Sequence, residues 1–278
     1  MAIGSAVLLG LYDVAKKMAL RKNDVLNVLL YATAFTALFL SPFLSGGPVS
    51  WHLMLVLKAI LVTASWISGL AALKTLPLTT VSTIKAFRPV LVLLFSIIIF
   101  SETLNAAQWT GCTLAALSMF MLSRASRQEG IDWSTDRGVL LMAVSVLTGV
   151  ASALYDKHIL SFMEPLFVQS WCNVYITALL AITVVLRPLR GKENAHAFKW
   201  DWWIPVIAAL ITVADFLYFS AVHRADALLS VISMLRRGSV IVTFACGAVL
   251  FNEHNIRRKT ISLFVMMAGM VFIICGSI

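Results

Sequence analysis

Apolar segments of about twenty residues follow one another along almost the whole chain, and they limit what it can fold into. Of the 278 residues, 60% are hydrophobic and 13% are charged, whereas soluble proteins carry about 25% charged residues. This composition excludes a soluble enzyme. A transmembrane helix needs about 20 apolar residues, so ten helices with short connections account for the length. We predict an all-α polytopic membrane protein with transmembrane helices over 3–20, 25–44, 52–73, 77–100, 104–123, 138–160, 165–187, 202–222, 226–251 and 257–276.

Short motifs recur between the two halves in one order and at a nearly constant offset. The pairs are 11–13 with 154–156, 81–85 with 232–236, and 100–102 with 251–253. Five helices per half is an odd number, so a tandem duplication must place the halves in opposite orientations. Inverted repeats are typical of transporters, whose substrate sites lie between the halves. We therefore predict two inverted five-helix repeats, with boundaries at 1–124 for the first repeat, 125–137 for the connecting loop and 138–278 for the second repeat.

Lysine and arginine are distributed unequally between the two sets of connections. Counting helix-end residues such as Lys16 and Lys17, the odd-numbered connections hold 15 of the 22, and the even-numbered ones hold only Lys157 and Arg224. The positive-inside rule then places the odd-numbered connections in the cytoplasm and both termini outside it. We expect a multi-pass protein of the cell (inner) membrane that contacts the lipid bilayer and no nucleic acid.

Four basic residues lie deep inside predicted helices, where a charge is costly and indicates function. Lys85 and Arg88 share one face of helix 77–100, and Arg236 and Arg237 lie near the middle of helix 226–251. Together they would form a cationic clamp, since guanidinium and ammonium groups bind carboxylate or phosphate. The alternative is that they form structural ion pairs, for example with Asp215.

Further polar residues complete the candidate substrate site. Asp215, in the middle of helix 202–222, is the candidate for coupling to a proton or a counter-substrate, or else a partner of the arginines. The hydroxyl residues that accompany the clamp and the tyrosines expected to contact the rest of the substrate are Ser82, Ser233, Tyr12, Tyr155 and Tyr218.

Two aspartates follow tyrosines in the duplicated motif and have lysines nearby in sequence. Asp13 precedes Lys16 and Lys17, and Asp156 precedes Lys157. We expect such pairs, close to helix ends, to form local solvated or interfacial salt bridges.

The segments 88–103, 108–111 and 237–253 carry a resemblance to a known family: a helix ends in Glu before a short turn into the next helix. With the five-plus-five arrangement, the chain resembles the EamA type of the drug/metabolite transporter (DMT) superfamily over nearly its whole length. That resemblance implies a secondary transporter working by alternating access, with termini usually cytoplasmic. The clamp also resembles the distant plastid sugar-phosphate translocators, which hold phosphate with a Lys on the fourth helix and a Lys-Arg pair on the ninth; Arg236 departs from that pattern.

The sequence leaves three functions open. The first is a transporter of a small anionic metabolite, an organic phosphate or carboxylate. The second is an exporter of amino acids or amphipathic drugs, with the basic residues in structural ion pairs. The third is a lipid transferase, for which His223 and Asp226 are the only acid–base candidates. We expect a transporter rather than an enzyme, without cofactor or metal, as a monomer or homodimer.

Overall fold

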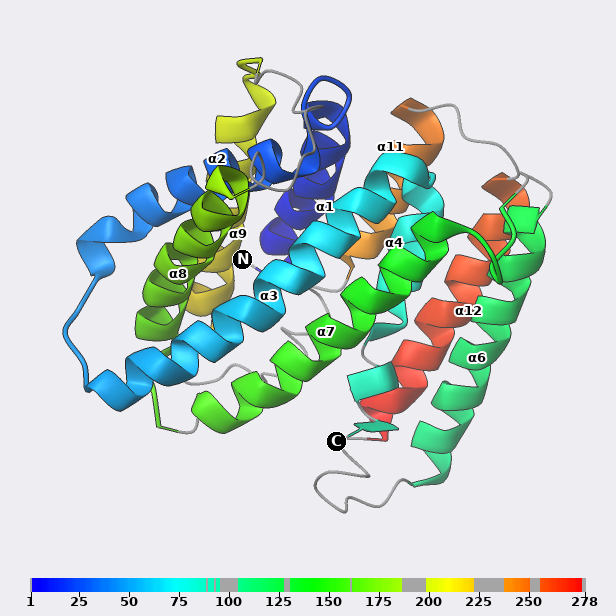
Figure 1. Cartoon of the computed structure of the whole chain (residues 1–278). Helices are drawn as coiled ribbons and strands as arrows, with labels where there is room; N and C mark the ends of the chain where they lie inside the picture. The colour runs from blue at the N-terminus through cyan, green and yellow to red at the C-terminus, as the bar shows by residue number, and fades with distance from the viewer. Residues whose placement is uncertain are drawn as a thin grey trace.

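The computed structural model describes residues 2–88, 90–92, 94–95, 105–127, 131–160, 162–186, 199–222, 238–250 and 256–276. These residues form a bundle of helices (Figure 1) and contain no strand. The elements are α1 (Ala2–Ala19), α2 (Val25–Leu40), η1 (Ser41–Phe43), α3 (Val49–Thr75), α4 (Leu78–Ala86), α6 (Ala106–Arg127), α7 (Arg137–Ile159), α8 (Pro165–Val185), α9 (Trp203–Val222), α11 (Ser239–Leu250) and α12 (Ile256–Cys275).

Five helical segments are long and apolar enough to cross a membrane, judged on the described residues alone. They are Val25–Phe43, Val49–Thr75, Arg137–Asp156, Pro165–Val185 and Ile256–Cys275. Large apolar side chains are exposed on the outside of the bundle, for example Leu53, Val249 and Phe264 at 68%, 74% and 70%. A soluble monomer rarely exposes so much apolar surface, whereas lipid accommodates it. The prediction of an all-α polytopic membrane protein is confirmed.

Prolines and caps begin several helices where the sequence predicts a boundary. Pro165 occupies the first turn of α8, where its missing N–H costs nothing, and Pro48 and Pro77 immediately precede α3 and α4. Asp136 caps α7, since its carboxylate accepts hydrogen bonds from the next free backbone N–H groups, those of Gly138 and Val139, at 2.7 and 3.2 Å. The end of the predicted helix 77–100 and the first half of the predicted helix 226–251 lie outside the described residues.

Helices of the first half pack mainly against helices of the second half. The main pairs are α1 with α9 and α11, α3 with α7 and α8, α2 with α8 and α9, α4 with α11, and α6 with α12. In Figure 1, α3 runs beside α7 across the middle of the bundle, and α6 runs beside α12 at its right edge. The pattern is symmetric, because the first helix of each half contacts the third helix of the other.

Small residues bring α6 and α12 into close contact. A Cβ atom on Gly111 would lie 2.6 Å from the carbonyl oxygen of Gly269, and a Cβ on Gly269 would lie 2.8 Å from that of Gly111. Next to this crossing, the Ser118 and Ser262 hydroxyls each donate to the other residue's carbonyl oxygen, at 2.6 and 2.9 Å. Glycine and serine at such positions let membrane helices approach closely.

Candidate functional site

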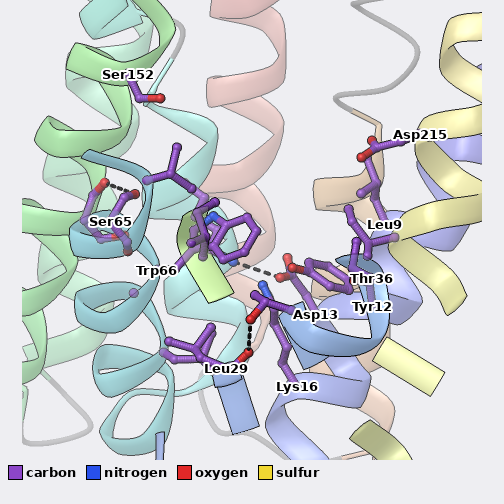
Figure 2. Close-up of a pocket in the computed structure, with 18 of the residues that line it drawn as sticks. Leu9, Tyr12, Asp13, Lys16, Leu29, Thr36, Ser65, Trp66, Ser152 and Asp215 are labelled. Atoms are coloured by element: carbon purple, nitrogen blue, oxygen red, sulfur yellow. Dashed lines mark hydrogen bonds and ion pairs between the residues drawn. The ribbon is translucent and has the colours of Figure 1, made fainter. Parts of the chain in front are cut away.

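A cavity of about 730 Å³ lies between the helices of the two halves. Its wall is formed by α1, α2, α3 and the residues around α4 from the first half, and by α7, α8, α9, the start of α11 and Met270 of α12 from the second (Figure 2). Apolar residues form much of the wall, together with seven charged residues: Asp13, Lys16, Lys58, Lys85, Arg88, Asp156 and Asp215. Charged groups inside a membrane are rare and face such cavities when they serve a substrate or ion.

Two of the lysines are paired with aspartates from other helices. The Lys85 ammonium donates to the Asp13 carboxylate at 2.9 Å, which joins α4 to α1 within the first half. The Lys58 ammonium donates to the Asp156 carboxylate, which joins α3 to α7 across the two halves. The expectation of local salt bridges at the helix ends is therefore wrong. Both aspartates face the cavity, six and three residues before their helices end, and the nearest cations come from neighbouring helices.

Arg88 contacts the backbone of the opposite half. Its guanidinium donates a hydrogen bond to the carbonyl oxygen of Gly149 in α7. A Cβ atom on Gly149 would lie 2.8 Å from the Arg88 Cζ atom, so only glycine leaves room for this approach. Arg88 lines the cavity and uses one guanidinium N–H for this hydrogen bond to α7. The other N–H groups of its guanidinium remain for further acceptors.

Lys16 lies in the last turn of α1 but faces inward, not toward the connection. Its side chain is buried, and the residue is 6% exposed. The ammonium lies 3.7 Å from the centroid of the Tyr12 ring and 5.8 Å from that of Trp66. Lys259 is also fully buried and donates to the Thr79 hydroxyl at 3.1 Å. The count of basic residues assigned both lysines to the odd-numbered connections, and the structure corrects this because both side chains lie inside the bundle. The remaining basic residues still favour the odd-numbered connections.

Asp215, the coupling candidate, projects into the cavity from α9. Its carboxylate accepts a hydrogen bond from the side-chain amide of Gln169 in α8 at 2.9 Å, and both residues line the cavity (Figure 2 labels Asp215). The proposed alternative partners, Arg236 and Arg237, lie outside the described residues.

The remaining predicted site residues divide into two groups. Tyr12 lines the cavity with Lys85, Arg88 and Asp215. Ser82 does not line it, because its buried hydroxyl donates to the Thr79 carbonyl at 2.9 Å. Tyr155 packs instead against a separate apolar cluster of α3, α7 and α8. Ser233, like the two arginines of the clamp, His223 and Asp226, lies outside the described residues, as does the side chain of Tyr218 in α9.

The cavity is closed at the end that faces connections 1–2 and 7–8. Buried aliphatic residues fill this end, among them Leu73, Leu76 and Ile204, each at most 1% exposed. The Lys17 ammonium donates to the carbonyl oxygens of Leu73 and Leu76 at 2.5 and 2.6 Å. Because a helix leaves its last carbonyls without partners, Lys17 caps α3 and ties α1 to it.

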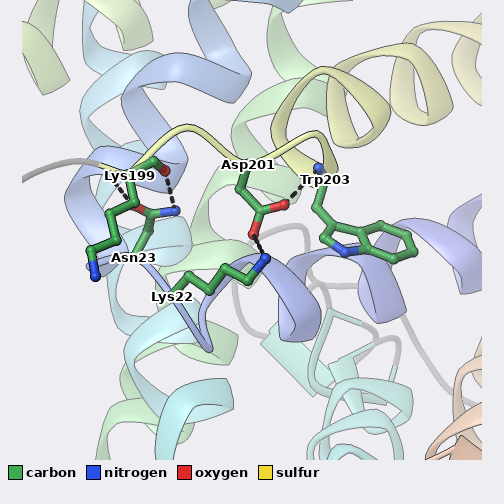
Figure 3. A network of polar contacts seen from close by, with 5 residues as sticks. All are labelled: Lys22, Asn23, Lys199, Asp201 and Trp203. Carbon is green, nitrogen blue, oxygen red and sulfur yellow. Dashed lines mark hydrogen bonds and ion pairs between the residues drawn. The ribbon is translucent and has the colours of Figure 1, made fainter.

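Polar contacts also tie the connections together at this closed end (Figure 3). The Asn23 amide donates to the Lys199 carbonyl at 2.9 Å and accepts from the Lys199 backbone N–H at 3.0 Å. The Lys22 ammonium lies 3.9 Å from the Asp201 carboxylate. That carboxylate also accepts a hydrogen bond at 3.1 Å from the backbone N–H of Trp203, the first residue of α9. At the other end the cavity wall includes two exposed residues at the α7–α8 connection, Leu160 and Pro165. Within the described residues, the cavity wall therefore extends to that face.

The family model of the EamA-like transporter family matches residues 1–124. Residues 1–124 belong to that family. The predicted membership of the EamA type of the DMT superfamily is therefore confirmed, and the similarity to plastid translocators stays a prediction. Members of this family are membrane transporters, so the match over residues 1–124 implies a membrane transporter of the DMT superfamily.

Solved structures share the fold of this chain. One, titled only "Crystal structure of protein", has a TM-score of 0.59 and 16% sequence identity, and the match covers 96% of this chain and 97% of that one. At this identity the likeness shows the fold alone. No curated protein matches the chain.

The cavity contains charged residues that the sequence did not assign to the site. Asp13, Asp156 and Lys58 could have been selected: the first two by the duplicated motif, and Lys58 as a charge within helix 52–73. No local pattern marks Lys16 or Gln169, since their inward direction depends on how the helices pack.

Proposed function

We propose that this EamA-type protein is a secondary active transporter that moves a small anionic metabolite, an organic phosphate or carboxylate, across the inner membrane by alternating access. One observation carries the proposal: the described cavity wall holds four cationic side chains against three carboxylates. An anion entering such a cavity is attracted by the excess positive charge, which acts strongly where little water screens it. Arg88 and Lys85 form the described part of the clamp.

The closed and open ends of the cavity support alternating access. Lys17 and Asn23 hold contacts at one end, and the cavity reaches the opposite face beside Leu160. A transporter of this type exposes its central site to one side at a time. Transport then requires the contacts at the closed end to open while the other end closes.

We further propose the two inverted five-helix repeats, 1–124 and 138–278, as the units that move. The symmetric packing supports this division, since α1 contacts α9 as α7 contacts α3, and α2 contacts α8 across the centre. The distribution of Lys and Arg supports cytoplasmic odd-numbered connections and extracytoplasmic termini. Asp215 is proposed as the coupling residue, because it offers a carboxylate inside the cavity wall.

A second function is favoured by a specific observation. Lys58 and Lys85 are both engaged by aspartates, which is what structural ion pairs in an exporter of amino acids or amphipathic drugs would require. The two functions differ in what Arg88 does. In the first it contacts the substrate, and in the second it only holds α7.

The test is transport by the purified protein in proteoliposomes, measured with radiolabelled glycerol 3-phosphate, malate, leucine and a lipophilic amine. The proposal expects uptake of one of the anions, reduced at least about tenfold by Arg88→Gln because a charged hydrogen-bond donor is removed. The control is Arg127→Gln, which removes the same charge from an arginine side chain that is 67% exposed. Uptake of leucine or the amine alone, unaffected by Arg88→Gln, would support the second function. Absence of all four activities would contradict both.

A further inference from the structure

Lys16 differs from the other cations of the cavity wall in its partners. Lys58 and Lys85 each bind an aspartate, and Arg88 binds a backbone carbonyl. The ammonium of Lys16 forms no hydrogen bond or ion pair with any residue that the structure describes. Asp13 lies one turn before it on the same helix, but its carboxylate is bound to Lys85 at 2.9 Å.

The surroundings of Lys16 stabilise its charge only in part. The residue is more than nine-tenths buried, and burial of a charge without a partner is costly. The Tyr12 ring, 3.7 Å away, offers a favourable cation–π contact. A ring face does not take up the three N–H donors of an ammonium group. The site therefore has donors at the cavity wall and no acceptor for them among the described residues.

The shape around Lys16 indicates what kind of molecule supplies that acceptor. Tyr12, Lys16 and Trp66 all line the cavity, and Figure 2 shows them together near Asp13. The aromatic faces of Tyr12 and Trp66 lie beside the ammonium and would pack against a carbon skeleton. An anionic oxygen group attached to a small apolar or ring-shaped body fits this combination.

We infer that Lys16 is the primary anion-binding residue of the cavity: its ammonium binds the carboxylate or phosphate of the transported molecule between the rings of Tyr12 and Trp66. This inference rests on the proposed anion transport but assigns the central role to a residue of α1. The Lys85–Asp13 pair then serves as a neighbouring neutral pair. Among the described residues, Lys16 is the cation of the wall that has no carboxylate or carbonyl partner of its own.

The first measurement is binding of inorganic phosphate, glycerol 3-phosphate and malate to the purified protein in nanodiscs, by calorimetry and by ligand-induced thermal stabilisation. Lys16→Gln and Lys16→Met are expected to weaken binding at least about tenfold, since a charge-assisted hydrogen bond is lost. Lys16→Arg keeps the charge with a different donor geometry and is expected to retain binding within about tenfold. The control is Arg127→Gln, which removes one positive charge from a side chain that is 67% exposed and should leave binding unchanged. Preference for phosphates or for malate identifies the anionic group.

The second measurement uses the wild-type protein and does not depend on how the variants fold. An amine-acylating reagent is applied with and without saturating ligand, and acylation of each lysine is followed by peptide mass spectrometry. The inference expects the ligand to protect Lys16 and not Lys22. Equal acylation of Lys16 in both conditions, or wild-type affinity in Lys16→Gln, overturns it. If the wild-type protein binds none of the anions, the proposed substrate class is wrong. If it binds an anion but Lys16 is neither protected nor required, only the assignment of Lys16 is wrong.

Discussion

The α6–α12 pair and the cavity wall are both contacts between the two halves, but the cavity wall adds ion pairs to the small-residue contacts that both contain. Gly111, Gly269, Ser118 and Ser262 hold α6 and α12 together with uncharged groups at close range. The cavity wall uses ion pairs such as Lys58–Asp156 around an open volume. Close packing of small groups has one good arrangement, whereas ion pairs can exchange partners. The comparison indicates that α6 and α12 are a fixed support and that the cavity wall is the part that rearranges.

The largest effect is expected from breaking the support. In Gly111→Val the new Cβ atom would lie within 2.6 Å of the Gly269 carbonyl oxygen and of the Ile273 side chain, so the helices must separate. Overpacking of this kind costs about 3 kcal/mol, which should appear as a lower melting temperature in detergent. Gly46→Ala is the control, because a Cβ there meets nothing within 4 Å. Equal melting temperatures for the two variants would contradict the close contact.

The next effect concerns the ion pair within the first half. Asp13→Asn leaves Lys85 without its carboxylate, and Asp13 is largely buried, with a side chain 17% exposed. Removing one partner of a buried pair is costly, but the 33% exposure of Lys85 lets cavity water compensate in part. We expect the free energy of unfolding to fall by about 2 kcal/mol. The double variant with Lys85→Gln should recover part of that loss in chemical denaturation.

A stability effect of similar size and a larger functional one are expected for the pair that crosses the halves. Asp156→Asn leaves Lys58 without its carboxylate, and the Lys58 side chain is 13% exposed, so the free energy of unfolding should fall by about 2 kcal/mol. Since the pair joins α3 to α7, its loss should also change the balance between the inward-open and outward-open states. Cysteine accessibility at position 160, beside the open end, measures that balance. Unchanged stability and unchanged accessibility in Asp156→Asn would contradict the pair's role.

The helices, but not the partners of their charges, could be predicted from the sequence. Hydropathy places a helix over 165–187, and α8 is Pro165–Val185, because the length of a span and its terminal proline are local features. Asp13 was expected to pair within its own helix, yet it binds Lys85, 72 residues away. Lys16 was counted with a connection because it lies near the end of α1. Partners and inward directions follow from the packing of distant segments, which hydropathy does not encode.

Two matched serine pairs give the smallest effect and the sharpest comparison. Ser65 and Ser145 exchange hydroxyl-to-carbonyl hydrogen bonds between α3 and α7 at 2.8 and 2.7 Å, as Ser118 and Ser262 do between α6 and α12. A hydrogen bond between membrane helices contributes on average about 0.6 kcal/mol, so Ser65→Ala and Ser118→Ala should lower stability by similar, small amounts.

The two alanine variants should differ in transport, because only the first pair lies at the cavity. Ser65 and Ser145 line it, whereas Ser118 is fully buried against α12. Ser65→Ala is therefore expected to change the rate of uptake in proteoliposomes about threefold, on the order of the free energy of one such hydrogen bond. Ser118→Ala should transport at the wild-type rate. If both variants alter uptake equally, α6 and α12 take part in the conformational change, and the division into a fixed support and a rearranging wall is wrong.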